Sequence, residues 1–150
     1  MKTKQEVVAL LVPLLQGYID NPETLGYDPV LTRCVYLGKN AKGDVVKCIF
    51  GACLTDEYLD ENLWRMEGKT AQSIMVGISS DDHMFKEEYK GIDTWVWQRC
   101  QSIHDSIAEG VGWREVMKKV ENLISTINNS TNPGEPITDL GLKFPEVAVN

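Results

Sequence analysis

The sequence has no basic run and no long apolar run, and both absences exclude functions. It holds 22 acidic residues against 15 basic ones, which gives a net charge of −7. Because affinity for DNA or RNA rests mainly on cations that neutralise phosphates, direct nucleic-acid binding is not expected. The longest apolar stretch, Val7 to Leu15, is about half of the roughly 20 residues that a membrane span needs, and Pro13 interrupts it. Membrane insertion is therefore not expected either.

Motifs for phosphate binding and for hydrolysis are also missing. The patterns G-x-x-x-x-G-K-S/T, G-x-G-x-x-G, H-E-x-x-H and G-x-S-x-G do not occur. No small-residue cleavage site follows the apolar run near the N-terminus, so a signal peptide is not expected. These absences favour a cytoplasmic protein that is not an enzyme and that holds no cofactor and no metal.

Length and composition are those of an ordinary globular domain. The chain has 150 residues, of which 43% are hydrophobic and 25% are charged, enough for one packed core. We predict one globular domain over residues 1–132. Residues 133–150 carry prolines and glycines without a helical period, and they are expected to form an extended or partly mobile arm. The four cysteines are expected to be buried free thiols rather than disulfides.

Three main helices are expected from apolar spacing and from capping residues. The first begins at a capping box of Thr3 and Glu6, and Pro13 predicts a kink in it or an early end. The second is capped by Asp93 and covers residues 94–109. The third covers residues 113–127, and its apolar positions keep helical spacing over four turns. Glycines between the last two predict an αα-hairpin.

Strand-type residues occupy the middle of the chain. The runs 34–37 and 45–50 flank a polar stretch that contains glycine, as in a β-hairpin, and residues 73–78 read as a further short strand. The predicted fold class is therefore α+β: a helix-rich single domain in which a small antiparallel sheet or hairpin is packed by about three main helices.

Cys100 and His104 form the most specific local cluster, because residues four apart share one face of a helix. Three interpretations stay open for them. They could be a Cys–His nucleophile pair, two ligands of a zinc site completed by Cys48 and Cys53, or a core thiol beside a histidine with one hydrogen bond at the core's edge. Since the spacings match no compact zinc motif, no metal is predicted.

Tryptophan is abundant, and three of the four tryptophans lie between positions 95 and 113. Trp95 and Trp97 are about 200° apart on a helix, so they cannot both face one core unless another element covers the far side. Either one of them marks an interface or the helix is sandwiched within the monomer. The candidate residues for binding a ligand or partner are Trp95, Trp97, Arg99, His104 and Trp113.

Three features lie between Cys48 and Trp113: a cysteine-rich apolar segment over 48–54, the pair Glu67-Gly68, and the stretch Gln101 to Asp105, which reads Gln-x-Ile-His-Asp and is followed by a tryptophan. In these features the chain resembles small proteins of unknown activity encoded by bacteriophages and some bacteria. The resemblance implies a phage-type accessory protein in the host cytoplasm, and it brings no catalytic residues with it.

The favoured function is a non-enzymatic accessory protein that binds and inhibits or modulates a host factor through an acidic and aromatic surface. A homodimer is compatible with this interpretation. One alternative is an oligomer that binds or sequesters a small ligand such as a nucleotide, with Trp97, Arg99 and His104 near the ligand. A second alternative is a hydrolase that depends on a cysteine and a histidine.

Overall fold

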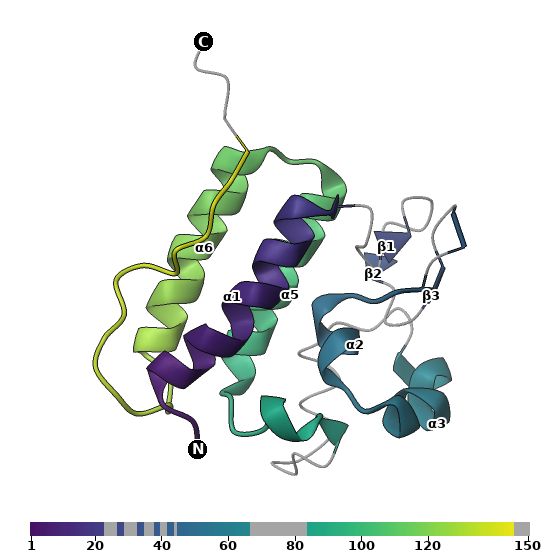
Figure 1. Ribbon diagram of the computed structural model, residues 1–150, viewed down its shortest axis with the longest axis horizontal. Helices are drawn as coiled ribbons and strands as arrows, with labels where there is room; N and C mark the ends of the chain where they lie inside the picture. Colours follow the sequence, from purple (N-terminus) through teal and green to yellow (C-terminus); the bar gives the residue numbers. More distant parts are fainter. Residues whose placement is uncertain are drawn as a thin grey trace.

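Helices dominate the structure. The computed structural model describes residues 1–22, 27–28, 33–34, 38–39, 42–43, 45–66 and 84–145. Its α-helices are α1 (Lys4–Asp20), α2 (Ile49–Cys53), α3 (Asp56–Met66), α5 (Thr94–Glu109) and α6 (Trp113–Asn128), and η3 (Glu87–Tyr89) is a 3-10 helix (Figure 1). No helix in these ranges combines the length and the apolar character that a membrane crossing requires.

The predicted α+β class is wrong. Five α-helices make up more than half of the part of the chain that the structure describes. Its β structure consists of two antiparallel pairs of two-residue strands and an isolated bridge between Leu54 and Phe85, which is too little for a sheet packed by helices. The strand pairs are β1 (Tyr27–Asp28) with β2 (Arg33–Cys34), and β3 (Gly38–Lys39) with β4 (Val45–Val46). The strand predicted over residues 73–78 lies outside the described residues.

A cysteine cap explains why the second predicted strand stops early. The sequence prediction continued this strand to position 50, but α2 begins at Ile49. Cys48 is the N-cap of that helix, and its Sγ accepts a hydrogen bond from the backbone N–H of Gly51. The backbone therefore turns into a helix within the apolar run, although the β-type side chains of this run favour a strand.

The capping box at the start of α1 is confirmed. Thr3 Oγ1 accepts from the backbone N–H of Glu6, and Glu6 Oε1 accepts from the backbone N–H of Thr3, both at 3.1 Å. Pro13 does not end the helix early, since α1 continues to Asp20. Proline frees the carbonyl four residues before it, here that of Ala9. Because Pro13 and Ala9 are both exposed, this carbonyl lies on the side of α1 where water can hydrogen-bond to it.

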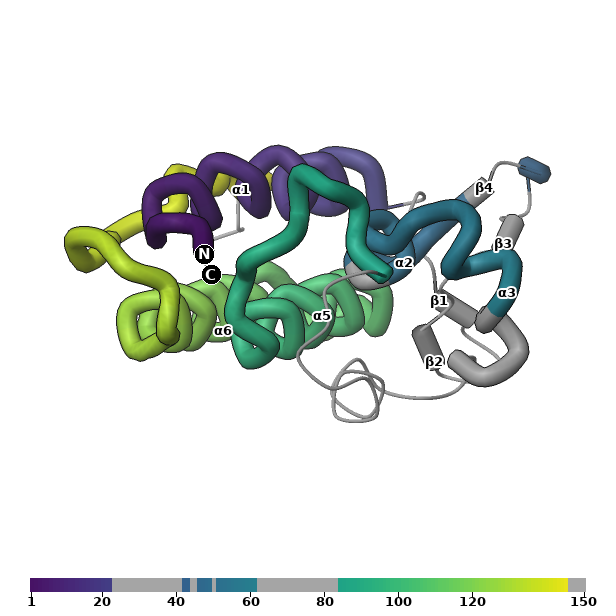
Figure 2. Tube along the Cα trace, turned by 90° about the horizontal axis from the view of Figure 1, so that it is seen from below, coloured from purple at the N-terminus to yellow at the C-terminus, as the bar shows by residue number. Residues whose placement is uncertain are grey.

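Helices α1, α5 and α6 form the main body of the molecule. The predicted αα-hairpin is present, with α5 and α6 packed antiparallel and α1 lying across them as a second layer (Figure 2). Gly110 and Gly112 form the connection, with φ values of 70° and 96°, which lie in the region that favours glycine. The layers meet through fully buried apolar side chains of all three helices, such as Leu11, Ile103 and Leu123.

The C-terminal segment 133–145, called the tail below, lies along α1 and α6 and forms no helix (Figure 1). The side-chain amide of Asn128 both donates to the carbonyl of Ile137 and accepts from its N–H, each at 2.8 Å. Gln16 on α1 makes the same pair of bonds with Lys143, also at 2.8 Å. Leu140, which is 5% exposed, joins the core between these two points.

Asn132, the residue before the tail, links three parts of the chain. Its side chain is 1% exposed; Nδ2 donates to the carbonyls of Lys2 and Gly91, and Oδ1 accepts from the N–H of Asp93. Its own carbonyl accepts from the buried ammonium group of Lys4. The start of α1, the start of α5 and the end of α6 are thus held together at one side chain.

We expect Asn132→Ala to lower the free energy of unfolding by roughly 2–4 kcal/mol, because it removes the bonds that the side chain makes to the carbonyls of Lys2 and Gly91 and to the N–H of Asp93 in a part-buried place. Urea denaturation monitored by circular dichroism measures this loss. The exposed neighbour Asn129, whose side chain makes one long bond of 3.5 Å to Ser125, provides the control variant Asn129→Ala. Equal losses in the two variants would contradict the role given to Asn132.

Candidate functional site

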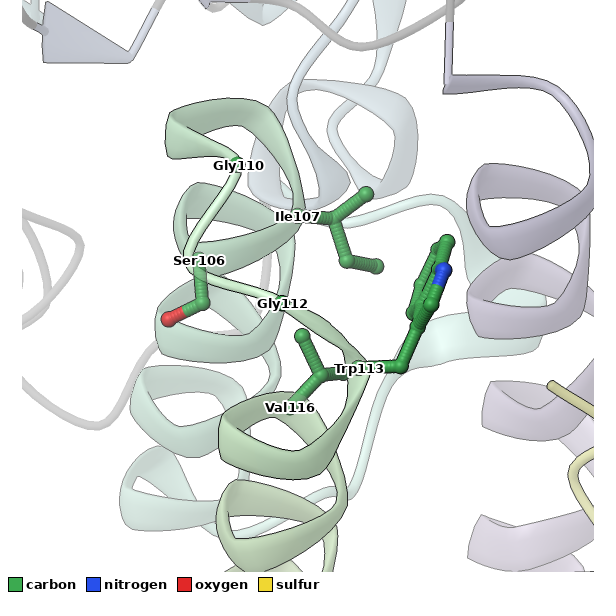
Figure 3. A pocket seen from close by; sticks show the side chains of 6 residues that line it. All are labelled: Ser106, Ile107, Gly110, Gly112, Trp113 and Val116. Atoms are coloured by element: carbon green, nitrogen blue, oxygen red, sulfur yellow. The ribbon is translucent and has the colours of Figure 1, made fainter. Parts of the chain in front are cut away.

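A small pocket opens beside the turn between α5 and α6. Its volume is about 200 Å³, and the side chains of Ile107 and Trp113 face each other across it (Figure 3). The complete lining is Ser106, Ile107, Gly110, Gly112, Trp113 and Val116. The two glycines lack side chains that could occupy the space, and none of the lining residues carries a charge. The site therefore suits an apolar group.

Trp113 connects this pocket to the tail. It is the first residue of α6 and is half-buried. Its ring lies 5.8 Å from the ring of Phe144, centroid to centroid, at an interplanar angle of 57°. Val111, in the turn between the two lining glycines, is 43% exposed. An apolar wall, an exposed valine and the end of the tail thus lie next to one another.

Trp95 and Trp97 have opposite environments, as their helical spacing predicts. Trp97 is 1% exposed and stacks on Phe85, with ring centroids 5.5 Å apart and planes 13° apart; it also contacts the edge of Tyr89. Trp95 is 55% exposed. Trp97 is therefore a core residue, and Trp95 is a candidate contact for a partner.

The five predicted binding residues do not form one site. Trp95 lies in the first turn of α5, whereas Trp113 begins α6 beyond the other end of α5, a helix that extends about 24 Å at 1.5 Å per residue. Arg99 is exposed, and its Nε donates to Thr126 Oγ1 at 3.2 Å. His104 is buried. Of the five, Trp113 alone lines the pocket.

His104 is fully buried on α5 with one ring nitrogen paired. Nδ1 lies 2.8 Å from Asp105 Oδ1, an oxygen that also accepts from Gln101 Nε2 at 2.8 Å. The ring of Tyr18 meets it edge to face, at a centroid distance of 5.1 Å. Nε2 has no hydrogen-bond partner among the described residues. Such an arrangement resembles an oriented general base, but the pocket beside α5 is not lined by His104.

The cysteines near this histidine are buried core thiols. Cys48, Cys53 and Cys100 are free and have no exposed surface. Burial raises the pKa of the Cys100 thiol, and burial beside Cys100 and Cys48 raises the pKa of Cys53. Both thiols therefore stay protonated at neutral pH, the opposite of an activated nucleophile. Among the described residues, no group of three or more His, Cys, Asp or Glu side chains is placed to hold a metal ion.

No family model matches the chain, and neither a curated protein nor a solved structure matches it. The resemblance to phage-encoded accessory proteins therefore stays a prediction.

Sequence reasoning missed most of the pocket. Ile107 and Val116 are apolar residues at helical spacing, which is the pattern of an ordinary core position. The available signal was Gly110-Val111-Gly112, because two glycines around one valine leave space beside a helix end and expose an apolar side chain. That signal predicted the turn, but it did not predict the cavity.

The buried thiols predict a loss of stability in alkali. In the unfolded chain a cysteine ionises above about pH 8.5. In the folded chain the pKa of the buried thiol is higher. The contribution of the protonated thiol to stability is therefore complete below the pKa of the unfolded chain and is lost as the pH rises above it. We expect the free energy of unfolding to fall by up to about 1.4 kcal/mol per pH unit for each such thiol. Urea denaturation at pH 7.5, 8.5 and 9.5 gives the free energy of unfolding at each pH. In Cys100→Ala this free energy should fall less steeply with pH than in the unaltered chain. If the pH dependence of the free energy of unfolding were the same in this variant, Cys100 would not be a cause of the loss of stability.

The Asp105 contact also predicts the tautomer of His104. An ionised carboxylate only accepts hydrogen bonds, so the 2.8 Å contact with Asp105 favours a proton on Nδ1 and an unprotonated Nε2 in the neutral ring. The longer contact of 3.3 Å between Nδ1 and Gln101 Nε2 would favour the other tautomer. Two-bond ¹H–¹⁵N correlation spectra at pH 7.5 should show this Nδ1–H tautomer for His104. Detection of the Nε2–H tautomer would mean that the Asp105 contact does not orient the ring.

Proposed function

We propose that this chain is a non-enzymatic binding protein of the cytoplasm and that its partner, another protein, inserts one apolar side chain into the pocket between α5 and α6. The pocket itself carries the proposal. Buried pockets that receive a single anchor side chain dominate the affinity of many protein interfaces. Here the lining is apolar apart from Ser106, one wall is a tryptophan, and the exposed Val111 lies beside it.

The size of the pocket favours a side chain over a cofactor or a nucleotide. Sites for small molecules usually occupy about 300–1,000 Å³. An engineered apolar cavity of about 150 Å³ holds one benzene molecule. A pocket of about 200 Å³ therefore accommodates a leucine or phenylalanine side chain, with the remainder of the partner lying outside.

Charge supports a partner with a basic surface. The chain carries a net charge of −7. Such an excess accelerates encounter with a positively charged protein and repels an acidic one. The apolar anchor would then supply affinity, while the acidic surface supplies long-range attraction. The resemblance to phage accessory proteins suggests a host factor as this partner.

The two alternative functions have less support in the geometry. A hydrolase would need an accessible nucleophile, yet Cys100 and His104 are fully buried and the thiol stays protonated. A nucleotide site would need donors for phosphate near its aromatic group, yet no charged side chain lines the pocket and Trp97 is buried in the core.

A minimal probe tests the pocket. N-acetyl-leucinamide presents one apolar side chain on a peptide unit, and we expect it to bind with a dissociation constant in the range of about 1–10 mM. In ¹H–¹⁵N spectra the shifted amides should be those of Ile107, Gly110, Gly112 and Val116. N-acetyl-glycinamide, which lacks the side chain, should shift none of them.

Matched variants assign the binding to the pocket. Trp113→Ala should abolish the shifts because it removes one wall, whereas Trp95→Ala, the same change at the far end of α5, should leave them intact. Val111→Glu alters an exposed position and should weaken binding without unfolding the chain. Shifts that survive both pocket variants, or a rise in melting temperature with ATP, would contradict the proposal.

A further inference from the structure

We propose that the tail is an intramolecular competitor, and that the surface beneath it binds an extended peptide segment of the partner through its backbone. The inference rests on the proposed binding function and specifies the form of the partner. The tail-binding surface is defined by Gln16 on α1 and by Asn128 and Trp113 on α6, each of which contacts the tail.

The two amide groups of this surface bind the backbone of the tail and not its side chains. Gln16 and Asn128 each use the oxygen and the nitrogen of one amide group to bond the N–H and the carbonyl of a single tail residue. This is the pairing that one edge of a β-strand offers to another, but here two helices supply it. Because every residue except proline has both backbone groups, the pairs do not select a particular sequence.

Selectivity comes from the apolar side chains on the inner side of the tail. Leu140 is buried in the core, and Ile137, Leu142 and Phe144 pack against the core in half-buried positions. Between them Thr138, Asp139, Gly141 and Lys143 are exposed. The segment that fits this surface is therefore extended, with apolar residues in the spacing of 137, 140, 142 and 144, and with any polar residues between them.

The surface is continuous with the pocket at Trp113. The indole contacts Phe144 of the tail and also forms one wall of the pocket. A bound segment that continues past the position of Phe144 thus reaches the pocket with its next apolar side chain. Displacement of the tail would join the two sites into one surface along α6.

Release of the tail leaves the helical core in place. The contacts between α1, α5 and α6 involve residues of these helices, such as Leu11, Ile103 and Val120. The tail adds to that core one buried side chain, Leu140, three half-buried apolar side chains and the two amide pairs. Near its start it also accepts one bond from the backbone N–H of Lys4 and one from the side chain of Gln5. Local opening of such a segment requires less free energy than global unfolding. Tethering gives the tail a high effective concentration, so an external peptide binds weakly until the tail is released.

The test uses a variant of the full chain that releases the tail. The substitution leaves the tail-binding surface unchanged. Leu140→Asp places a charge at a buried position, and Thr138→Asp adds the same charge at an exposed position of the same segment as the control. The probe is an acetylated and amidated peptide with the native sequence of residues 133–145. A peptide with the same composition in scrambled order serves as its control.

We expect the native peptide to bind Leu140→Asp at least about tenfold more tightly than it binds the unaltered chain or Thr138→Asp. The side-chain amides of Gln16 and Asn128 and the indole N–H of Trp113 should shift in ¹H–¹⁵N spectra. If Leu140→Asp does not fold, Leu140→Ala takes its place in the same comparison. The proposal is overturned if the folded Leu140 variant does not bind the native peptide or if the scrambled peptide binds equally well. It is also overturned if both Leu140→Asp and Leu140→Ala unfold the chain.

Measurement of N-acetyl-leucinamide on the same samples separates this inference from the proposed function. Loss of the pocket signal with retained peptide binding would contradict the anchor pocket alone. A retained pocket signal without peptide binding would contradict only the role of the tail as a competitor.

Discussion

The side chain of Asn132 is the contact on which the arrangement of the three long helices depends. One amide group satisfies the backbone of the N-terminal residues, of the loop before α5 and of the N-cap residue Asp93. Asp93 in turn caps α5 and accepts from the N–H and the hydroxyl of Thr131. Because these bonds are part-buried, loss of the amide would leave backbone groups with poorer access to water than they have in the unfolded chain. The register between α1, α5 and α6 is therefore fixed at one end of the bundle.

The other end of the bundle is built with less side-chain volume. There the connection between α5 and α6 consists of Gly110, Val111 and Gly112, and the space beside it is the pocket. A polar network closes one end of the bundle, and an apolar pocket opens at the other end. The candidate site therefore lies where the packing is incomplete. A function that requires contact with a partner is compatible with this asymmetry, since the opening can change without disturbing the network.

Helix boundaries could be predicted from the sequence because their signals are local. Thr3 with Glu6, Asp93, and the glycines after position 109 act on backbone groups within one turn, and the helices begin and end there. The fold class could not be predicted in this way. The run of strand-type residues around position 49 is short and apolar. Such a run is compatible with a strand or with a buried helix, and tertiary contacts determine which of the two forms. The cap made by Cys48 is an unusual one, and the sequence pattern gives no sign of it.

The candidate site was predicted only where one residue type carried the signal. Trp113 was identified because tryptophan favours interfaces and three of the four tryptophans lie close together in the sequence. Ile107 and Val116 could not be distinguished from core residues. The same reasoning placed Trp97 and His104 at a binding surface, but both are buried. Phe85 and Tyr89 pack against Trp97, and Tyr18 of α1 packs against His104. Long-range pairs such as Gln16 with Lys143 have no local pattern at all.

These amide pairs limit the tail in a manner that differs from ordinary side-chain packing. They tolerate substitution at positions 137 and 143, provided that the N–H is kept, but they fix the number of residues between the two positions. A single insertion or deletion in this interval would move one backbone group out of reach and would turn Leu140 away from the core. Over evolutionary time the tail should therefore vary freely in sequence at its exposed positions while its length between the two amides stays constant.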